Sequence, residues 1–322
     1  CIQCNTCAYV CPHATIRAYA LTEEEVKNAP EGLKTAPVKA GKGKGVYTYA
    51  IGVSPLDCMG CGVCVEACLA KDKAIKMVPQ ESELTQAQVW DYLVKTAPKA
   101  DMQDNTVKGS QFKQPYLEFS GSCAGCAETS YARLVTQLFG DRMYISNATG
   151  CSSIWGGPAA TSPYCTNSEG KGPAWCNSLF EDNAEHGLGM FVGQKAIRGA
   201  LAEETRKLIA IEWAVPALKE AAQKWLDTME DGEANQAAAK AYIAALEQGV
   251  CTIDEVTAFV SSPAAKDAFG DKLPEMQAHA QELKASGAQF CDCDACKLCL
   301  SILSKKEYLN KKSVWIFGGD GW

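Results

Sequence analysis

The chain has 322 residues, of which 47% are apolar, and a formal net charge of −7 from 31 basic and 38 acidic side chains. So mild a charge argues against an extended nucleic-acid surface or a disordered acidic tail. No run approaches the roughly 18 apolar residues that cross a bilayer, and the first residues lack a secretory pattern, so we expect a cytoplasmic protein with no nucleic-acid or membrane partner. The length predicts one small and one large domain. Because the chain opens on Cys1 and stops at Trp322 after a strand and a glycine turn, we expect both ends to lie inside a longer polypeptide.

The first elements follow the cysteines, which number 18 and are concentrated in tight runs. Two runs, at residues 1–20 and 58–78, form an internal repeat. Between them GKGKG at 41–45 predicts a flexible turn, and a strand is expected over Val46–Val53. Residues 79–115 follow as a polar connector.

This connector contains one expected helix, over Thr85–Lys95, and Pro98, Gly109 and Pro115 prevent a longer one. The second part then starts near Tyr116.

The second part mixes helices and strands. We expect a helix over Thr129–Phe139, a strand over Arg142–Ser146 and a helix from Ala184 onward. Residues 194–285 are rich in Ala, Glu, Lys and Leu, which predicts a solvated helical insertion.

The chain closes with a short apolar strand, Ser313–Phe317, that runs into the glycine-rich GGDG of residues 318–321. A strand that ends in a glycine turn is typical of a cofactor site in an open parallel sheet.

The two cysteine runs carry the most specific motif. The first has the pattern C-x2-C-x2-C-x3-C-P and the second keeps its intervals, with Leu69 in place of the proline; the runs are Cys1, Cys4, Cys7, Cys11 and Cys58, Cys61, Cys64, Cys68. This spacing is that of bacterial two-cluster ferredoxins, in which the fourth ligand of each cluster comes from the other run. We therefore predict one [4Fe-4S] cluster on Cys1, Cys4, Cys7 and Cys68, and another on Cys58, Cys61, Cys64 and Cys11.

Zinc is the alternative for these runs, because tetrahedral tetrathiolate sites also use C-x2-C pairs. The triple spacing is not a zinc pattern, and soft thiolates suit iron–sulfur cubes, so the clusters are preferred.

A third cysteine group consists of Cys123 and Cys126, in the stretch CAGCAE, and Cys151, in NATGCSSIW. Three thiols from a pair and a distant loop suit a cluster, but no fourth lies in the same neighbourhood. The fourth ligand therefore lies beyond Trp322, or one of the three is not a ligand.

These residues carry a family resemblance. The segments LEFSGSCAGCAETSYARL, NATGCSSIWGG, SLFEDNAEHGLGM and VWIFGGDGW closely resemble pyruvate:ferredoxin (flavodoxin) oxidoreductases, and the ferredoxin-like part resembles the domain that precedes them in that family. The resemblance covers most of the chain except roughly residues 200–305.

The resemblance implies a fold and a division into domains. We expect an α+β ferredoxin-like two-cluster domain at 1–78, a linker at 79–115, and an incomplete α/β thiamine-diphosphate-binding domain at 116–322 with a helical insertion at about 200–305.

The resemblance also implies an enzyme that decarboxylates pyruvate with CoA to acetyl-CoA. Its cofactors are thiamine diphosphate, Mg2+ and three [4Fe-4S] clusters, and ferredoxin or flavodoxin accepts the electrons. Its full-length protein is expected to form a homodimer.

The site residues that the resemblance implies follow from the matched motifs. Cys123, Cys126 and Cys151 hold the third cluster with a cysteine nearer the C-terminus, and Glu128 and Cys151 line the thiamine site. Asp320 is the Mg2+ ligand, while Gly319, Gly321 and Trp322 meet the cofactor. No catalytic residue is assigned within this chain.

Three positions depart from the family pattern, namely Ala127, Ser130 and His186. Two alternatives also stay open: an electron-transfer subunit without chemistry of its own, and a sister enzyme acting on another 2-oxoacid.

A last run, Cys291, Cys293, Cys296 and Cys299, ends the helical insertion. It suits zinc or an extra cluster, but its first interval of one residue is cramped and the resemblance includes no site here, so we expect free thiols. The remaining cysteines, Cys165, Cys176 and Cys251, are expected to be ordinary small apolar side chains. His13, His186 and His279 show no ligand spacing.

Overall fold

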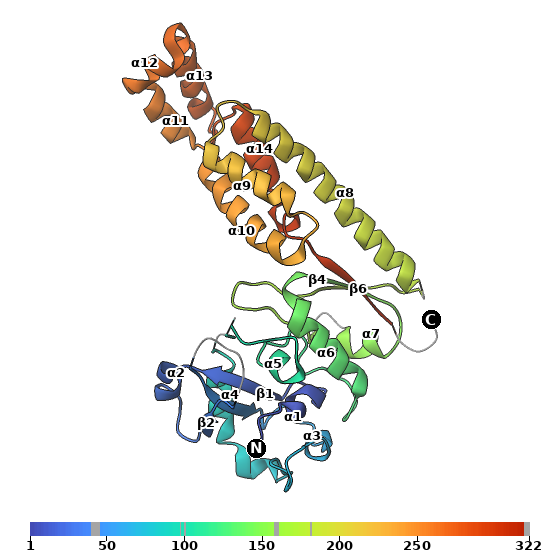
Figure 1. Cartoon of the computed structure of the whole chain (residues 1–322). Helices are drawn as coiled ribbons and strands as arrows, with labels where there is room; N and C mark the ends of the chain where they lie inside the picture. The colour runs from blue at the N-terminus through green and yellow to red at the C-terminus, as the bar shows by residue number, and fades with distance from the viewer. Residues whose placement is uncertain (40–45, 97, 100, 158–160, 181, 319–322) are drawn as a thin grey trace. The chain divides into compact units, whose positions relative to one another are not determined.

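The computed structural model describes residues 1–39, 46–96, 98–99, 101–157, 161–180 and 182–318. The chain divides into two units (Figure 1), one formed by Cys1–Leu188 with the strand segment that starts at Ser313, and the other by Gly189–Lys312. The GKGKG turn expected at 41–45 and the residues Gly319–Trp322 lie outside the described part.

The first part of the chain forms an antiparallel sheet of three strands in the order β1-β3-β2. Its strands are β1 (Ile16–Leu21), β2 (Thr35–Pro37) and β3 (Thr48–Val53). The helices around it are α1 (Thr6–Val10), α2 (Glu23–Lys27), α3 (Val63–Glu66), the 3-10 turn η1 (Gln80–Glu83) and α4 (Gln86–Leu93).

Both faces of this sheet are covered, and the alternation of side chains along the strands decides which residues each face buries. Ala18 and Ala20 of β1 pack with Tyr49 of β3 in one small core. On the other face Leu21 and Ala50 pack with Val89 and Leu93 of α4. The connector therefore covers the sheet with an apolar helical face, although its sequence is mostly polar.

The second part of the same unit is built on a parallel sheet in the order β5-β4-β6. Its strands are β4 (Met143–Asn147), β5 (Ala174–Asn177) and β6 (Ser313–Phe317), and its helices and 3-10 turn are α5 (Val107–Ser110), α6 (Ala127–Phe139), η2 (Gly140–Arg142) and α7 (Cys151–Gly156). Because all three strands run in the same direction, their carboxyl ends meet at one edge.

The second unit is helical. The long helix α8 (Asn183–Ala210) begins in the first unit, and the helices and 3-10 turns that follow are α9 (Pro216–Asp227), α10 (Gly232–Gly249), α11 (Ile253–Val260), α12 (Ala264–Phe269), η4 (Gly270–Lys272), α13 (Leu273–Ala285), α14 (Asp294–Leu303) and η5 (Lys306–Tyr308). Its core is formed by apolar side chains of α8, α9, α10 and α14, among them Leu201, Trp225, Tyr242 and Ile302. Within the described residues, no helix has both the length and the apolar character needed to cross a bilayer.

Several sequence predictions of local structure are confirmed. The strands expected at Val46–Val53, Arg142–Ser146 and Ser313–Phe317 are β3, β4 and β6. The helices expected at Thr85–Lys95 and Thr129–Phe139 are α4 and α6, and the helix expected from Ala184 onward is α8. Strands β1, β2 and β5 and the short helices α1 and α3 were not predicted.

Candidate functional site

The two cysteine runs share a backbone turn that requires positive φ. In the second run Gly60 and Gly62 adopt φ of 66° and 76°, as glycine does without steric cost. At the matching positions of the first run stand Gln3 and Asn5, each with φ of 61°. The two runs therefore share one backbone geometry, although the positive-φ residues are glycines in the second run and Gln3 and Asn5 in the first.

Hydrogen bonds hold these two non-glycine residues in place. Gln3 donates from Nε2 to the Pro37 carbonyl oxygen at 2.8 Å and accepts from the Lys39 amide at 2.7 Å. Asn5 accepts from the Tyr49 hydroxyl at 2.7 Å and donates to the Lys108 carbonyl oxygen at 2.8 Å. These bonds offset the backbone strain of a side chain at positive φ.

The first run surrounds a cavity of about 360 Å³ that is lined by four cysteines, Cys1, Cys4, Cys7 and Cys68. Its wall includes the apolar side chains of Ile51, Val53 and Ile75. Cys68 comes from the second run, so the structure brings together all four residues predicted to share this cluster. The donor set and the space both suit a [4Fe-4S] cube.

Amide and hydroxyl groups point at the sulfurs of this cavity. The Ala74 amide donates to Cys68 Sγ at 3.2 Å, and the Thr6 hydroxyl donates to Cys4 Sγ at 3.3 Å. Backbone hydrogen bonds, from Ala70 first, lower the pKa of Cys68. Burial first, and then the neighbouring thiolate charges of Cys4, Cys64 and Cys68, raise the pKa of Cys7 to about 11. Positive charge from bound iron would offset this concentration of negative charge.

The other predicted cluster group is Cys11 with Cys58, Cys61 and Cys64. Burial raises the pKa of Cys64, and the charges of Cys11, Cys61 and Cys58 raise it further. Cys11 is 7% exposed and its sulfur lies 3.3 Å from the Thr15 hydroxyl. Cys7, Cys11 and Cys64 pack in one apolar cluster, so the two ligand groups are neighbours.

The third predicted group lies at two helix beginnings. Cys123 and Cys126 precede α6, and the Cys126 amide donates to the Cys123 carbonyl oxygen at 3.1 Å. Cys151 is the first residue of α7. Trp155 of α7 donates from Nε1 to Glu128 Oε2 of α6 at 3.3 Å, which links the two helices.

The Cys123–Cys126 loop also lies against the second cysteine run. Gly125 has φ of 80°, and a Cβ added to it would lie 3.5 Å from Val63 Cγ2 and 4.0 Å from Cys61 Cβ. These distances are ordinary van der Waals contacts, so the positive φ, and not a lack of space, favours glycine in this turn. The loop of the third group thus lies close to the predicted ligand loop of the Cys11, Cys58, Cys61, Cys64 group.

Polar side chains gather at the carboxyl ends of the parallel strands. Asn147, at the end of β4, donates from Nδ2 to Asn177 Oδ1 at 2.7 Å and to Ser153 Oγ at 3.1 Å. Asn183 donates to the Phe317 carbonyl oxygen at the end of β6 at 2.6 Å. Asn147 Oδ1 and Ser152 Oγ are buried without a hydrogen-bond partner in the described residues. Such unsatisfied groups suit a polar ligand at this edge.

In the sequence, a glycine-rich stretch follows β6. Its predicted cofactor residues Gly319, Asp320, Gly321 and Trp322 lie outside the described part of the chain. His186, one of the departures from the family pattern, has Nδ1 2.8 Å from the Ser146 hydroxyl.

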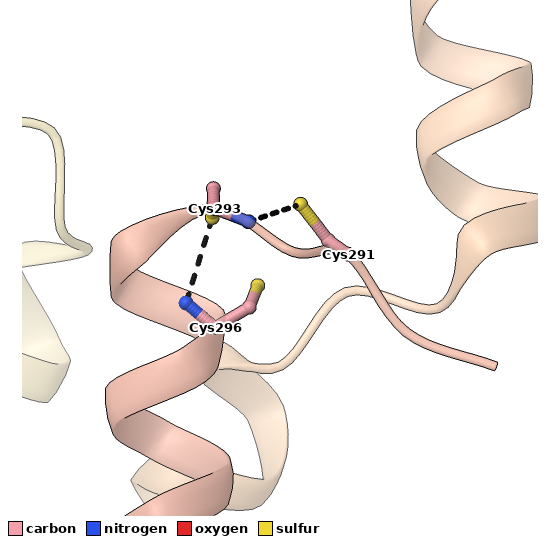
Figure 2. Close-up of side chains that lie close together, drawn as sticks. All are labelled: Cys291, Cys293 and Cys296. Carbon is pink, nitrogen blue, oxygen red and sulfur yellow. Dashed lines mark hydrogen bonds between the residues drawn. The ribbon is translucent and has the colours of Figure 1, made fainter. Parts of the chain in front are cut away.

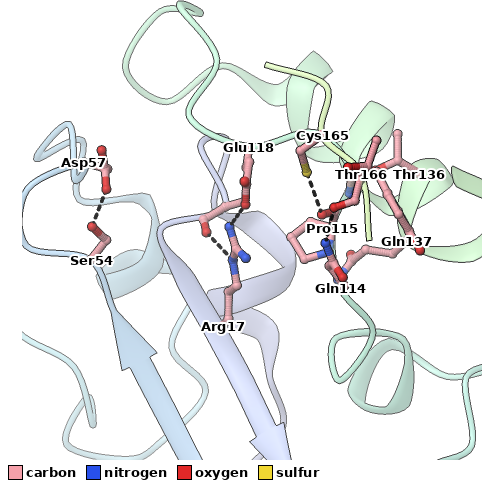
Figure 3. Close-up of polar contacts among 12 residues, drawn as sticks. Arg17, Ser54, Asp57, Gln114, Pro115, Glu118, Thr136, Gln137, Cys165 and Thr166 are labelled. Carbon is pink, nitrogen blue, oxygen red and sulfur yellow. Dashed lines mark hydrogen bonds and ion pairs between the residues drawn. The ribbon is translucent and has the colours of Figure 1, made fainter. Parts of the chain in front are cut away.

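The segment that joins the antiparallel and parallel parts is fixed on both sides (Figure 3). Glu118 forms an ion pair with Arg17 of β1. On the other side the Tyr116 amide donates to Thr136 Oγ1 of α6 at 3.1 Å, and Cys165 donates to the Pro115 carbonyl oxygen at 3.5 Å. These contacts hold the cysteine runs and the parallel sheet in one unit.

The structure also brings together residues that we expected to be free thiols. The sulfurs of Cys291, Cys293 and Cys296 lie within 4.8 Å of one another, the one group of three possible metal ligands this close among the described residues. Cys299 is buried in the helical core instead. The close spacing in the sequence was the only available signal for this group.

Comparison with known proteins agrees with the geometry. Residues 1–72 match the family model of the 4Fe-4S dicluster domain. The whole chain is 43% identical to a pyruvate-flavodoxin oxidoreductase of Klebsiella pneumoniae and 43% identical to a pyruvate:ferredoxin oxidoreductase of Moorella thermoacetica. It is 41% identical to a pyruvate dehydrogenase (NADP+) of Cryptosporidium parvum, of which it covers 16%.

The chain spans about a quarter of the two bacterial relatives, 24% of each. Over its whole length, therefore, the chain is homologous to one segment of the pyruvate:ferredoxin and pyruvate-flavodoxin oxidoreductases.

Proposed function

We propose that this chain is the electron-transfer segment, and part of the thiamine-diphosphate segment, of a cytoplasmic enzyme that oxidatively decarboxylates pyruvate with CoA to acetyl-CoA. The observation that carries the proposal is the position of two cysteines: Cys68 of the second run lines the cavity of the first, and Cys11 of the first run packs with Cys64 of the second. An exchange of ligands between the two runs is the ligand pattern of two-cluster ferredoxins.

In this proposal eight cysteines hold two one-electron carriers. Cys1, Cys4, Cys7 and Cys68 hold one [4Fe-4S] cluster, and Cys11, Cys58, Cys61 and Cys64 hold the other. Amide groups such as that of Ala74 stabilise the sulfur charge, which tunes the cluster potential.

Cys123, Cys126 and Cys151 supply three ligands of a further cluster, and a cysteine outside this chain supplies the fourth. The short distance between Gly125 and Val63 supports this role, because the third ligand loop lies beside the second. Ferredoxin or flavodoxin is the proposed electron acceptor, and the full-length protein is proposed to be a homodimer.

At the edge of the parallel sheet, Glu128, Cys151, Gly319, Gly321 and Trp322 are proposed to contact thiamine diphosphate. Asp320 is proposed to bind Mg2+, which prefers carboxylate oxygen. Thiamine diphosphate, when bound, supplies the carbanion chemistry needed to decarboxylate a 2-oxoacid. The unsatisfied Asn147 Oδ1 and Ser152 Oγ support a polar ligand here.

Paired substitutions test the exchanged ligands in the anaerobically purified chain. We expect about eight irons and eight sulfides, four of each per cube. Cys4→Ser with Cys68→Ser should lose one cluster, whereas Cys4→Ser with Cys11→Ser should lose both. Cys176→Ser, which removes an exposed thiol of the same unit, is the control. If Cys4→Ser with Cys11→Ser lost only one cluster, the exchange would be wrong.

The substrate is tested with the full-length protein. Turnover with pyruvate and CoA should exceed turnover with 2-oxoglutarate, and the acceptor should be reduced in proportion to acetyl-CoA formed. Preference for 2-oxoglutarate would favour a sister 2-oxoacid enzyme, and the absence of any turnover would favour an electron-transfer subunit.

A further inference from the structure

The three grouped thiols of the helical unit lie at one turn (Figure 2). Cys291 and Cys293 precede α14, Cys293 caps it, and Cys296 follows in its first turn. Cys296 is 2% exposed, and the other two are half-buried. The three sulfurs lie within 4.8 Å of one another.

Each of the three sulfurs accepts a backbone amide. The Cys293 amide donates to Cys291 Sγ at 3.4 Å, and the Cys296 amide donates to Cys293 Sγ at 3.5 Å. The Cys251 amide, 45 residues from Cys296, donates to Cys296 Sγ at 3.5 Å. Amides directed at sulfur stabilise thiolates and orient them as metal ligands.

Cys251 lies beside this group because two chain segments pair there. The Cys291 amide donates to the Cys251 carbonyl oxygen at 2.9 Å, and the Ile253 amide donates to the Gln289 carbonyl oxygen at 3.0 Å. A β-bridge joins Thr252 to Phe290. The backbone of Cys251 is therefore bonded to two of the three grouped cysteines.

The other ionisable groups near the thiols are engaged with one another. His279 Nε2 lies 2.9 Å from Asp292 Oδ1, and Lys297 Nζ lies 3.9 Å from Asp292 Oδ2. No carboxylate or imidazole joins the three sulfurs within 4.8 Å in the described residues, and an all-sulfur set suits a soft or borderline metal.

The distances favour one ion over a cube. A Zn–S bond of about 2.3 Å places tetrahedral sulfurs about 3.8 Å apart, which three sulfurs within 4.8 Å reach with small side-chain movements. A [4Fe-4S] cube takes one thiolate on each iron, so its thiolates are more widely separated.

We propose that Cys291, Cys293 and Cys296 bind one zinc ion, and that Cys251, whose exposed sulfur lies outside the 4.8 Å group, turns toward them to become the fourth ligand. Cys251 follows α10, and Cys291 precedes α14. The site therefore joins the two ends of the segment that contains α11, α12 and α13. The ion is structural, because it fixes these two ends to each other.

Zinc and iron content, measured together on the whole chain without a metal-binding tag, test the site. We expect about one zinc per chain, with sulfur at about 2.3 Å in zinc-edge X-ray absorption. Cys293→Ser should lose the zinc and keep the iron, and Cys176→Ser should keep both. Zinc retained by Cys293→Ser, or iron lost in its place, would overturn the proposal.

Cys251→Ser tests the fourth ligand. We expect the zinc shell to change from four sulfurs to three sulfurs and one lighter atom, and an unchanged four-sulfur shell would exclude Cys251.

A measurement on the unsubstituted chain covers the case in which a variant fails to fold. A zinc chelator should expose Cys293 to alkylation and residues 252–290 to proteolysis, with the iron content unchanged. Alkylation of Cys293 at the same rate before and after chelation would contradict a metal here. Because the readout is zinc, the outcome does not depend on the iron–sulfur or thiamine proposals.

Discussion

Arg133 of α6 donates from Nη2 to the carbonyl oxygen of Ala8 in α1 at 2.8 Å. The same guanidinium donates to the Tyr9 carbonyl oxygen at 2.5 Å, and to Gln111 and Gln137 at 2.9 Å each. The side chain is 2% exposed, and burial lowers the pKa of Arg133 to about 10, partly offset by the Cys11 charge. A buried positive charge therefore lies close enough to Cys11, a predicted cluster ligand, to interact with its sulfur.

Arg133→Met should lower both stability and a cluster potential. It leaves buried acceptors unsatisfied, for which we expect a loss of about 2–5 kcal/mol. Removal of the positive charge near Cys11 should also make the potential of the Cys11 cluster more negative. Thermal unfolding and an anaerobic EPR redox titration measure the two effects.

The control is Arg206→Met, since Arg206 is a 57% exposed side chain in the helical unit. It should change stability by less than about 0.5 kcal/mol and leave the potential unchanged. A wild-type potential in Arg133→Met would show that the cluster does not sense this charge.

Gly62→Ala should destabilise the second ligand loop through the backbone alone. Gly62 has positive φ, and an added Cβ would meet no atom within 4 Å. The expected cost is about 1–2 kcal/mol, seen as a lower midpoint of anaerobic thermal unfolding. Gly121→Ala, also in open space but without positive φ, should be nearly neutral. Equal effects of the two substitutions would argue against the backbone explanation.

Glu25 should make stability depend on acid pH. Burial acts to raise its pKa, but hydrogen bonds from Lys99 and Thr22 outweigh this and lower the pKa below the usual 4.5. The wild-type advantage over Glu25→Gln should therefore be present above pH 4.5 and disappear as the pH falls through the folded value.

Unfolding midpoints from about pH 6 to about pH 2 measure this difference across the titration of the carboxyl group. Glu24→Gln, in an exposed carboxylate of the same helix, is the control. An advantage of wild type over Glu25→Gln that did not change with pH would rule out titration as the cause.

Trp225→Ala should unfold the helical unit at a markedly lower temperature. Trp225 is fully buried, and its Nε1 donates to the Leu309 carbonyl oxygen at 2.8 Å. The expected loss is about 3–5 kcal/mol, measured by the loss of helical circular dichroism on heating. Trp213→Ala removes the same chromophore from a side chain that is 69% exposed, and should change stability little. Similar midpoints for the two variants would contradict the assignment of the core.

The features that could be predicted from the sequence are those that depend on short-range patterns of residues. Cysteine spacing indicated the two runs, and apolar periodicity predicted α6 and α8. Strand β1 was missed because it is defined by its pairing with β3, in which Ile16 lies opposite Val53, and such long-range pairing leaves little local signal.

The burial of Arg133 and the grouping of Cys291, Cys293 and Cys296 also could not be predicted from short-range patterns. Arg133 lies in an amphipathic helix, where an arginine usually faces solvent, and only the carbonyl groups of α1 explain its burial. Free thiols were expected at Cys291, Cys293 and Cys296 because the first interval has only one residue, and the support of this turn by the backbone of Cys251, far away in the sequence, was not foreseen. The spacing of cysteines in one sequence does not show which distant backbone amides will donate hydrogen bonds to a sulfur.

The matched turns of the two cysteine runs have a consequence for the order of assembly. The turn at Gly60 and Gly62 is accessible to the unfolded chain, because glycine adopts positive φ without help. The turn at Gln3 and Asn5 depends on Pro37, Lys39, Tyr49 and Lys108, and so forms only after those segments have folded around it. We therefore expect the second ligand loop to form before the first, and each cluster to be complete only when one cysteine from the other run is in place.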